Sequence, residues 1–433
     1  MAKIQPSLNN MNAPAPTRRF GIKQMGPSTT LAVFAILLIA GHFSGGVWAI
    51  GGIALATLLA FASVVSERKM PKPDPCLLAI ALLALTWMAA SIGWSVSPNI
   101  SIHKCVRLAT VFLPLILLTS PNIKAKANSV FIFPVIALTI MIGALALGME
   151  LKLGGPMQEL LHHGEVELTK YNRGLTYVIL LAFPVMAWIK SNGSAFPFPA
   201  SSRTPRFKRS EIMLALFILA LLFPASLTES SSGKLALIVG LAITLAASLG
   251  PVLVTRILMV LPATLVAWPY AARSLFVKFH DHLDILPASW HHRMEIWDYM
   301  SWRILEKPWL GWGLGTSHVL PFQEPNGALY EYAINAAAHP HNAVTELWVE
   351  LGLPGLALGI IFAYWALKKA TRLPPAIIPF ALGGWAAALC LSLIAYDFWT
   401  DSLFAAFALT GFAFSLLDHN RKDCIQNARR RPL

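Results

Sequence analysis

The stretch AAAHPHNAVTELWVELGLPGLALGI, residues 336–360, joins a polar segment with histidines to a run that is apolar enough to enter a membrane. Five polar side chains stand in the crossover, those of His339, His341, Asn342, Glu346 and Glu350. Ionisable groups near the bilayer raise the free energy unless they find partners or serve a function. Two interpretations are open from this stretch alone: a helix end that faces water, or a reaction centre.

The rest of the chain has the composition of a membrane protein. Of its 433 residues, 56% are hydrophobic and only 13% are charged, and its mean hydropathy is +0.60, whereas soluble domains carry about 25% charged residues. Apolar runs of about 20 residues, enough to cross a bilayer as helices, recur along the chain. We predict an all-α polytopic membrane protein with about twelve transmembrane helices, roughly at 28–43, 46–66, 76–94, 103–120, 128–148, 173–190, 211–227, 232–249, 251–270, 341–368, 376–395 and 400–417.

We expect a single transmembrane domain over residues 28–417. A disordered basic cytoplasmic N-terminus, 1–27, precedes it, and a basic cytoplasmic tail, 418–433, follows it. The first apolar run is read as an uncleaved span because a second span follows at once. The four cysteines show no CxxC or metal-ligand spacing, and none falls in a long outer loop, which argues against a disulfide framework or a cysteine metal site.

The positive charges predict the orientation of the chain. Lysine and arginine gather at both termini and in four short connections, 66–74, 122–128, 201–210 and 368–372. With twelve spans, all of these segments lie on one side, which the positive-inside rule identifies as the cytoplasm. We therefore assign the net charge of +13 to orientation and to contact with anionic membrane lipids, not to nucleic acid. The outer side then holds two longer loops, 149–172 and 271–340, in which most of the histidines gather.

The helix that begins near His341 brings a polar wedge into the membrane from the outside. One face, by three-and-four spacing, holds His341, Thr345, Trp348, Gly352 and Gly355, and a second stripe holds Asn342, Glu346 and Glu350. Glu350 lies about 14 Å below His341 along the helix axis, where a carboxylate needs a polar or cationic partner. We expect Gly352 and Gly355 to permit the close approach of a neighbouring helix and Pro354 to kink the span.

A second element, WHHRMEIWDYMSWRILEK at 290–307, has an apolar stripe at helical spacing. We expect an amphipathic helix that lies along the membrane interface, with its tryptophans at the depth of the lipid headgroups. Arg293 stands at the edge of the stripe, while Glu295 and Asp298 point away from the apolar side. The guanidinium group could bind a phosphate in bidentate geometry or snorkel to a lipid headgroup.

Further charged residues lie at the outer ends of other spans. Arg173, in KYNRGLTY at 170–177, runs against the positive-inside bias and is either a functional group or an interfacial anchor. Weaker candidates of the same kind are Lys104, Arg107, Lys234, Asp397 and Asp401, for which anchoring or a helix end is the simpler interpretation. The HxH pairs come with no HExxH motif and no clear carboxylate set, so we expect neither a metal site nor another cofactor.

At this point three segments resemble one known family. HNAVTELWVELGLPG, residues 341–355, fits the His–Asn to Gly–x–x–Gly pattern of the bacterial O-antigen ligases, within the O-antigen ligase/polymerase superfamily. HRMEIWDYMSWRILEKPWLGWGLGT, residues 292–316, resembles the segment just before it in that family, and NRG at 172–174 resembles the arginine of an earlier outer loop. The long outer loop before the histidine helix also matches.

The resemblance implies a membrane glycosyltransferase fold and a metal-independent, inverting reaction on the periplasmic side of the bacterial inner membrane. The donor would be a glycan on undecaprenyl diphosphate and the acceptor a sugar hydroxyl of lipid A–core. Arg173 and Arg293 would bind the diphosphate, and His341 would activate the hydroxyl. We count Asn342, Glu346, Lys104, Arg107 and Lys234 among the candidate substrate-binding residues. Many members have Ser-Arg-Gly where this chain has SSSGK, so Ser232 stands near the place of that arginine and Lys234 is its candidate substitute.

Other functions stay open at this stage. An O-antigen or exopolysaccharide polymerase uses the same kind of donor with a second lipid-linked glycan as acceptor, and it shares these motifs. A protein O-oligosaccharyltransferase would usually have extra outer domains. A transporter would place its polar residues near the bilayer midplane, on broken helices related by repeats, whereas the polar residues here gather on the outer side.

Overall fold

The computed structural model describes residues 22–128, 131–161, 167–192, 206–279, 282, 285, 288–320, 339–395 and 397–429. Within them, eleven helices are long and apolar enough to cross a membrane, and Ile378–Ile394 is a shorter apolar helix. The all-α, multi-pass class is therefore confirmed. Most of the N-terminal segment expected to be disordered, and the histidines His162, His163 and His280, lie outside the described residues.

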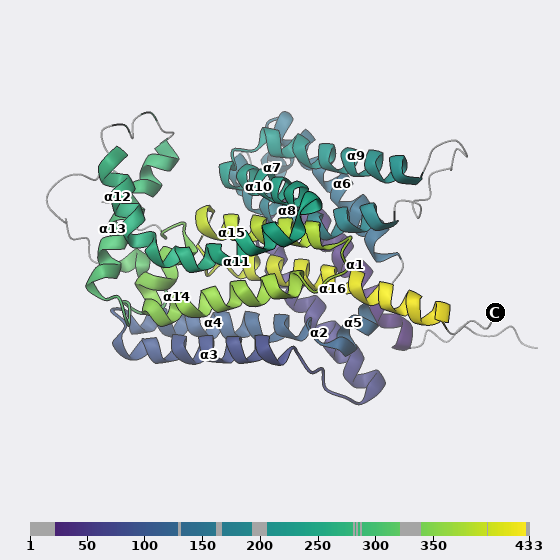
Figure 1. Ribbon diagram of the computed structural model, residues 1–433, viewed down its shortest axis with the longest axis horizontal. Coiled ribbons are helices and arrows are strands. Elements are labelled where there is room, and N and C mark those ends of the chain that lie inside the picture. Colours follow the sequence, from purple (N-terminus) through teal and green to yellow (C-terminus); the bar gives the residue numbers. More distant parts are fainter. Residues whose placement is uncertain are drawn as a thin grey trace, which may run out of the picture.

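The membrane helices correspond one to one with the expected spans. They are α1 Ile22–Phe43, α2 Val47–Glu67, α3 Pro75–Ser91, α4 Pro98–Leu117, α6 Ile132–Lys152, α8 Tyr171–Asn192, α9 Arg206–Leu227, α10 Ser231–Leu249, α11 Pro251–Thr264, α14 Ala343–Ala370, α15 Ile378–Ile394 and α16 Asp401–Arg429. The other α-helices are α5 Pro121–Ala127, α7 Pro156–Leu161, α12 Trp268–Phe279 and α13 Ala288–Glu306. In Figure 1 the membrane helices run roughly along one direction, which is that of the long axis of the molecule.

Two boundaries differ from the expectation. The ninth span does not end near residue 270: α11 stops at Thr264, a 3-10 turn follows at Leu265–Ala267, and the chain continues as α12. Pro269, near the start of α12, has no backbone N–H to continue a helical ladder, which explains the change of direction. The last helix, α16, continues past residue 417 to Arg429, so the start of the expected tail is helical.

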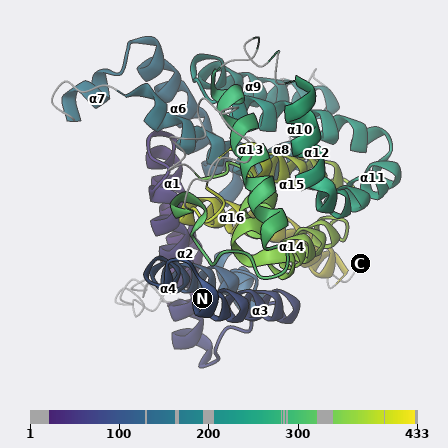
Figure 2. The same cartoon turned by 90° about the vertical axis from the view of Figure 1, so that its left-hand side faces the viewer.

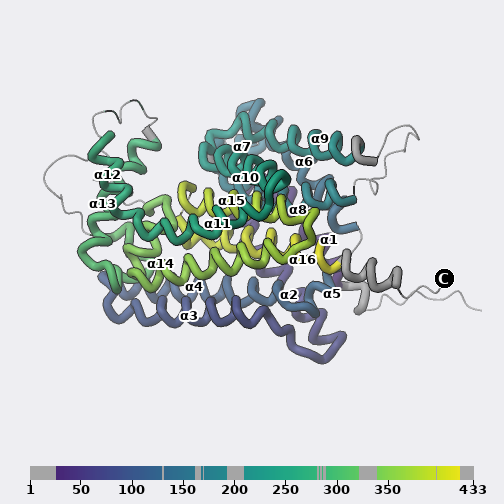
Figure 3. The backbone as a smooth tube through the Cα atoms, viewed as in Figure 1, coloured from purple at the N-terminus to yellow at the C-terminus, as the bar shows by residue number. Residues whose placement is uncertain are grey.

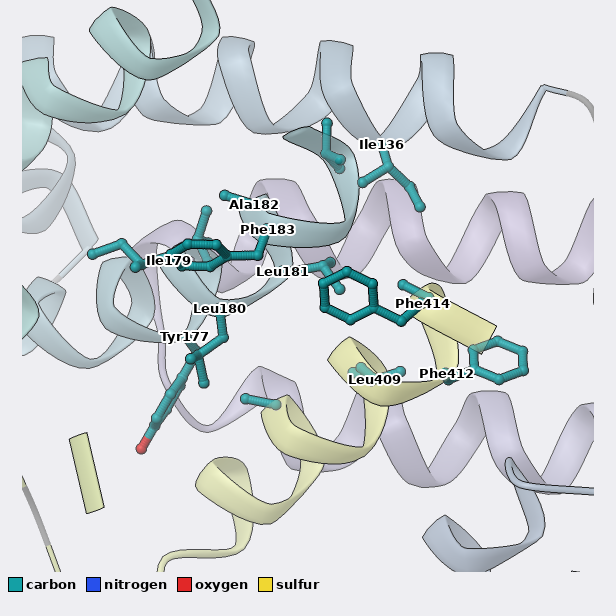
Figure 4. Packing of buried hydrophobic residues seen from close by; sticks show 14 of the residues in the cluster. Ile136, Tyr177, Ile179, Leu180, Leu181, Ala182, Phe183, Leu409, Phe412 and Phe414 are labelled. Atoms are coloured by element: carbon teal, nitrogen blue, oxygen red, sulfur yellow. The ribbon is translucent and has the colours of Figure 1, made fainter. Parts of the chain in front are cut away.

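Helix α8 forms the centre of the bundle. Every residue from Gly174 to Ile189 is buried by protein, whereas the other membrane helices keep faces free for lipid. Figure 4 shows Leu181 and Phe183 of α8 between Ile136 of α6 and Phe414 of α16. A helix that is apolar all round needs such a surrounding. The burial fixes α8 in place and thereby fixes Arg173, which is exposed at its outer end.

Helices α12 and α13 lie across one end of the bundle. They stand nearly perpendicular to the membrane helices in Figure 1, and the end-on view of Figure 2 shows them in front of α14 and α15. Ile296, Met300 and Ile304 of α13 pack with Phe276 of α12 and Trp348 of α14. The helix expected in 290–307 is therefore present, but its central part contacts protein. Trp297 is buried, so its side chain faces protein.

The basic connections lie at the opposite end of the bundle. Figures 1 and 3 show α5, the α2–α3 connection and the C-terminal ends of α14 and α16 together at this end, far from α12 and α13. The charged residues of 66–74, 122–128 and 368–372 thus share one side of the molecule, as twelve crossings require. His341 lies at the end of the protein that carries α13, opposite the basic connections.

Candidate functional site

The site is organised around a break in α14. Gly352 has φ 68° and ψ −169°, which interrupts the helix between two α-helical halves. A Cβ atom here would stand 2.1 Å from the carbonyl oxygen of Trp309, and the positive φ also favours glycine. We expected a kink at Pro354, but the helix already breaks at Gly352, before the proline.

The turn at 308–313 fills this break. The backbone N–H groups of Trp312 and Gly313 donate to the carbonyl oxygens of Val349 and Glu350, each at 2.8 Å, and Leu353 N donates to Pro308 O at 2.9 Å. The turn thus satisfies backbone groups that the helix can no longer pair. The close approach at Gly352 is therefore made by a turn and not by a neighbouring helix. At Gly355 a Cβ atom would meet Leu351 and Leu347 of the same helix.

Glu350 connects three segments at this break. Its side chain is buried and accepts hydrogen bonds from Gly315 N at 2.6 Å, Ser317 N at 3.2 Å and the indole Nε1 of Trp399 at 2.7 Å. Carboxylates that accept several N–H groups are strongly held. Glu350 thus has the polar partners that the sequence analysis predicted it would need. Through them it links α14 to the segment 311–317 and to the connection between α15 and α16.

Asp397 of that connection and Asp401, the first residue of α16, hold this region to α4. Lys104 Nζ lies 3.0 Å from Asp397 Oδ2, and Arg107 Nε lies 2.6 Å from Asp401 Oδ2. Burial alone would raise the pKa of Asp397, but hydrogen bonds with Glu346 and Lys104 bring this pKa below its usual value. Lys104 and Arg107 therefore have structural partners, whatever they contribute to substrate binding.

His341 stands directly before the first turn of α14. It adopts φ 53°, a left-handed conformation that is uncommon for residues other than glycine. Its Nδ1 lies 2.8 Å from the carbonyl oxygen of Ala395, and since a carbonyl can only accept, Nδ1 carries the proton. Burial, together with the neighbouring His339, lowers the pKa of His341 to about 4. The imidazole is thus neutral near pH 7, with the lone pair on Nε2.

The neighbours of His341 are fixed by hydrogen bonds to the same helix start. Asn342 caps the helix, because its Oδ1 accepts from Thr345 N at 3.0 Å. This leaves the amide Nδ2 as the group that Asn342 can offer to a substrate. Trp297 of α13 donates from Nε1 to Pro340 O at 2.9 Å, and Glu346 accepts from Phe398 N at 2.8 Å. The loop before α14 is thus tied to both α13 and the α15–α16 connection.

His339 lies beside His341, although nothing in its local sequence distinguishes it from the rest of the loop. Its ring lies 4.2 Å from that of His341, centroid to centroid. Burial lowers the pKa of His339; Asp397 opposes this shift, and the positive charges of Arg173 and Lys104 add to it. Burial and Lys104 likewise lower the pKa of His318. Arg173, Lys104 and Asp397 therefore lie within electrostatic reach of one histidine, although they come from α8, α4 and the α15–α16 connection.

Arg293 approaches His341 from α13. Its Nη1 donates to Ser289 O at 2.9 Å, its guanidinium group lies 5.8 Å from the centre of the Trp290 ring, and its charge contributes to the lowered pKa of His341. The face of α13 that we expected to be wet is covered, because Glu295 and Asp298 are buried. His291 Nε2 lies 3.1 Å from Glu295, and Arg273 Nε lies 3.8 Å from Asp298.

Lys234 belongs to the first turn of α10, which packs against the start of α8. Ser230 Oγ accepts from Gly233 N at 3.1 Å and lies 3.4 Å from Thr176 Oγ1. The turn SSSGK is thus adjacent to the helix start that carries Arg173. Unlike Arg173, Arg293 and Lys104, Lys234 is not among the charges that act on the site histidines described above.

The arrangement suits a transfer reaction that builds negative charge. A neutral imidazole with an available Nε2 can accept a proton from a hydroxyl group. Fixed guanidinium groups nearby can stabilise an anionic leaving group. Residues 212–360, which include Arg293, His341 and Gly352, match the sequence profile of the O-antigen ligase family.

This part of the chain is similar to the O-antigen ligase family. Similar curated proteins include three described as candidate polysaccharide ligases. That of Rickettsia conorii is 27% identical over 207 residues, which cover 47% of this chain and 46% of the relative. That of Rickettsia felis is 28% identical over 167 residues, 37% of this chain and 40% of the relative. That of Rickettsia typhi is 34% identical over 80 residues, 18% of this chain and 20% of the relative.

The matches are partial. The chain spans less than half of the length of these curated relatives. The family profile contains Arg293, Lys234 and the histidine helix but not Lys104, Arg173 or Asp397. The similarity thus covers α9 to the first part of α14, and the structure adds the residues of α4, α8 and the α15–α16 connection.

The break in α14 leads to a direct prediction about stability. Gly352→Ala forces a Cβ atom into the 308–310 turn and strains the positive φ, so we expect a loss of roughly 2–4 kcal/mol, as for other strained or overpacked sites. The measurement is the midpoint of thermal unfolding of the detergent-purified protein. Gly411→Ala is the matched control, because its Cβ meets nothing within 4 Å. Equal midpoints for the two variants would contradict this description of the break.

Proposed function

We propose that the protein transfers a glycan from undecaprenyl diphosphate to a sugar hydroxyl of lipid A–core, on the periplasmic side of the bacterial inner membrane. The observation that carries the proposal is the convergence of His341 with Arg293 and with the His339–Arg173–Lys104 group. These residues come from α14, α13, α8 and α4, and they meet at the end of the bundle remote from the basic connections. The match of residues 212–360 to the O-antigen ligase family supports the reaction class.

The proposed reaction uses the chain's own side chains. Nε2 of His341 accepts the proton of the acceptor hydroxyl while that oxygen attacks the anomeric carbon of the donor. The bond between this carbon and the diphosphate oxygen breaks, and its electron pair leaves with the diphosphate. Arg293 and Arg173 stabilise the charge that develops there. Attack opposite the leaving group inverts the anomeric configuration, and no metal ion takes part in these steps.

A lipid-linked donor also suits the apolar cavity in the bundle. The cavity has a volume of about 730 Å³ and is lined by α3, α4, α14, α15 and α16. Phe398 and Trp399, next to the site, line one end, and Asp74, Lys369 and Arg372 line the other. Its walls are mainly aliphatic and aromatic, as a binding site for a long hydrocarbon chain would be. The diphosphate of such a donor would reach the arginines at the outer end.

Removal of the two main site groups tests the proposal. We expect His341→Ala to lower the transfer rate of the purified protein about 10²–10⁴-fold, the usual contribution of a general base, and Arg293→Ala to lower it about as much. The assay follows glycan transfer from a defined undecaprenyl diphosphate donor to lipid A–core. Arg256→Ala, an exposed arginine of α11, serves as the control. Full activity of both site variants would refute the assignment.

The pH dependence of the rate tests the protonation state. The pKa of His341, about 4, keeps the base deprotonated from pH 8 down to near pH 5, so kcat/KM has no acid limb from this group until the pH approaches 4. An unperturbed histidine would instead lose half of its base form at about pH 6.5. The measurement is kcat/KM between pH 4 and pH 8. An acid limb near pH 6.5 that disappears in His341→Ala would contradict the lowered pKa.

The acceptor distinguishes a ligase from a polymerase. In cells that lack the gene, we expect long lipid-linked polymer and core lipopolysaccharide without attached glycan on a gel, because the transfer to core is lost. If the protein polymerised repeat units, the core would instead carry a single repeat. A core bearing one repeat unit would therefore overturn the acceptor assignment and leave the donor assignment standing.

A further inference from the structure

We propose that Ala395 and residues 397–400, between α15 and α16, position His341, and that the hydrogen bond between Trp399 and Glu350 holds these residues in place. The proposal rests on the function proposed above, because it concerns the orientation of the imidazole in that reaction. The argument starts from the single protein contact described for the imidazole nitrogens, the one between Nδ1 and Ala395 O at 2.8 Å. This carbonyl selects the tautomer and orients the ring, as the second partner of a functional histidine generally does.

Ala395 is not part of a rigid helix. Helix α15 ends at Ile394 and α16 starts at Asp401, so the carbonyl lies at the beginning of a short irregular connection. Its position then depends on the contacts of the residues that follow it. Three side chains from outside the connection supply them: Glu346, Glu350 and Lys104.

These contacts join the connection between α15 and α16 to the same part of α14 that follows His341. Glu346 accepts from Phe398 N at 2.8 Å, and Glu350 accepts from Trp399 Nε1 at 2.7 Å. Both glutamates belong to the first half of α14, the same half-helix whose start carries His341. On the other side, Asp397 pairs with Lys104 of α4 at 3.0 Å. One half-helix therefore presents the histidine and also fixes the carbonyl that orients it.

Glu350 also binds the segment that follows the turn at the helix break. The carboxylate that accepts from Trp399 also accepts from Gly315 N and Ser317 N. Trp399 is itself buried, in contact with Met88 of α3 and Leu351 of α14. Such over-determined surroundings explain how His341 is kept at φ 53°, a conformation that persists only where neighbouring contacts impose it.

The test is the variant Trp399→Phe, which keeps an aromatic ring in the core but removes the N–H that donates to Glu350, together with part of the indole ring. We expect kcat to fall about 10–100-fold, as small displacements of catalytic groups do, with KM for the undecaprenyl diphosphate donor nearly unchanged. Trp48→Phe is the matched control, because Trp48 is also fully buried and donates from Nε1 to a backbone carbonyl, Gly41 O at 3.2 Å. We expect this control to keep its kcat.

The specific readout is a double-mutant cycle with His341→Ala. If Trp399 acts through the histidine, Trp399→Phe lowers kcat in the native background and has no further effect in the His341→Ala background. Equal losses in both backgrounds would show a purely structural role and overturn the proposal. A Trp399→Phe protein with native kcat would do so too. If Trp399→Phe does not fold, Glu350→Gln, which loses acceptor capacity at the same contacts, takes its place in the cycle.

The outcomes separate this proposal from the proposed function. Native activity of His341→Ala would remove the basis of both. An inactive His341→Ala beside a fully active Trp399→Phe would leave the reaction assignment intact and refute only the positioning role of the connection.

Discussion

The end of the molecule that carries α12 and α13 depends on the break of α14 at Gly352 and on the buried carboxylate of Glu350 just before it. A continuous helix would have used its own carbonyl groups and excluded the turn at 308–313. The break releases these carbonyls to Trp312 and Gly313, and Glu350 then accepts from both the turn and Trp399. The polar wedge that looked costly in the sequence is thus the structural joint between α14, the end of the long outer loop and the last two spans.

This joint brings together groups from distant parts of the chain. Arg173 stands at the end of α8, which is enclosed by protein, and Arg293 lies on a helix that packs across the bundle. His341 follows a loop whose backbone is held by Trp297. Rigid elements thus present each charged group, and the histidines His339 and His341 lie between them. Fixed positive groups of this kind can stabilise negative charge that develops in a reaction without reorganising during it.

Much of the fold could be predicted from the sequence, because membrane spans depend on local composition. Apolar length located the twelve helices, and the lysine and arginine clusters placed 66–74, 122–128 and 368–372 on one side. The break at Gly352 was harder to predict. Glycine and proline indicate a distortion of the helix, but the turn at 308–313 that pairs with the broken helix lies about forty residues earlier in the sequence. Helical spacing also predicted that Glu295 and Asp298 face solvent. Both side chains are buried instead.

The candidate site was predictable to a similar degree. His341, Arg293 and Arg173 stood out because charged groups are unusual at outer helix ends, and the family pattern supported them. His318, His339 and Trp399 did not, since nothing in their local sequence reports the pairing of the 339–341 loop with the α15–α16 connection. Asp397 and Asp401 appeared as isolated acids, and their partners on α4 are almost three hundred residues away along the chain.

The stereochemistry of transfer tests the central claim most directly. The purified protein is supplied with a donor of known anomeric configuration and with lipid A–core, in the presence of a chelator, and the new glycosidic bond is examined by NMR. Single displacement by a hydroxyl that His341 activates, with the diphosphate leaving toward the arginines, predicts a product of inverted configuration formed without a divalent ion. A retained configuration, or a strict requirement for a divalent ion, would contradict it.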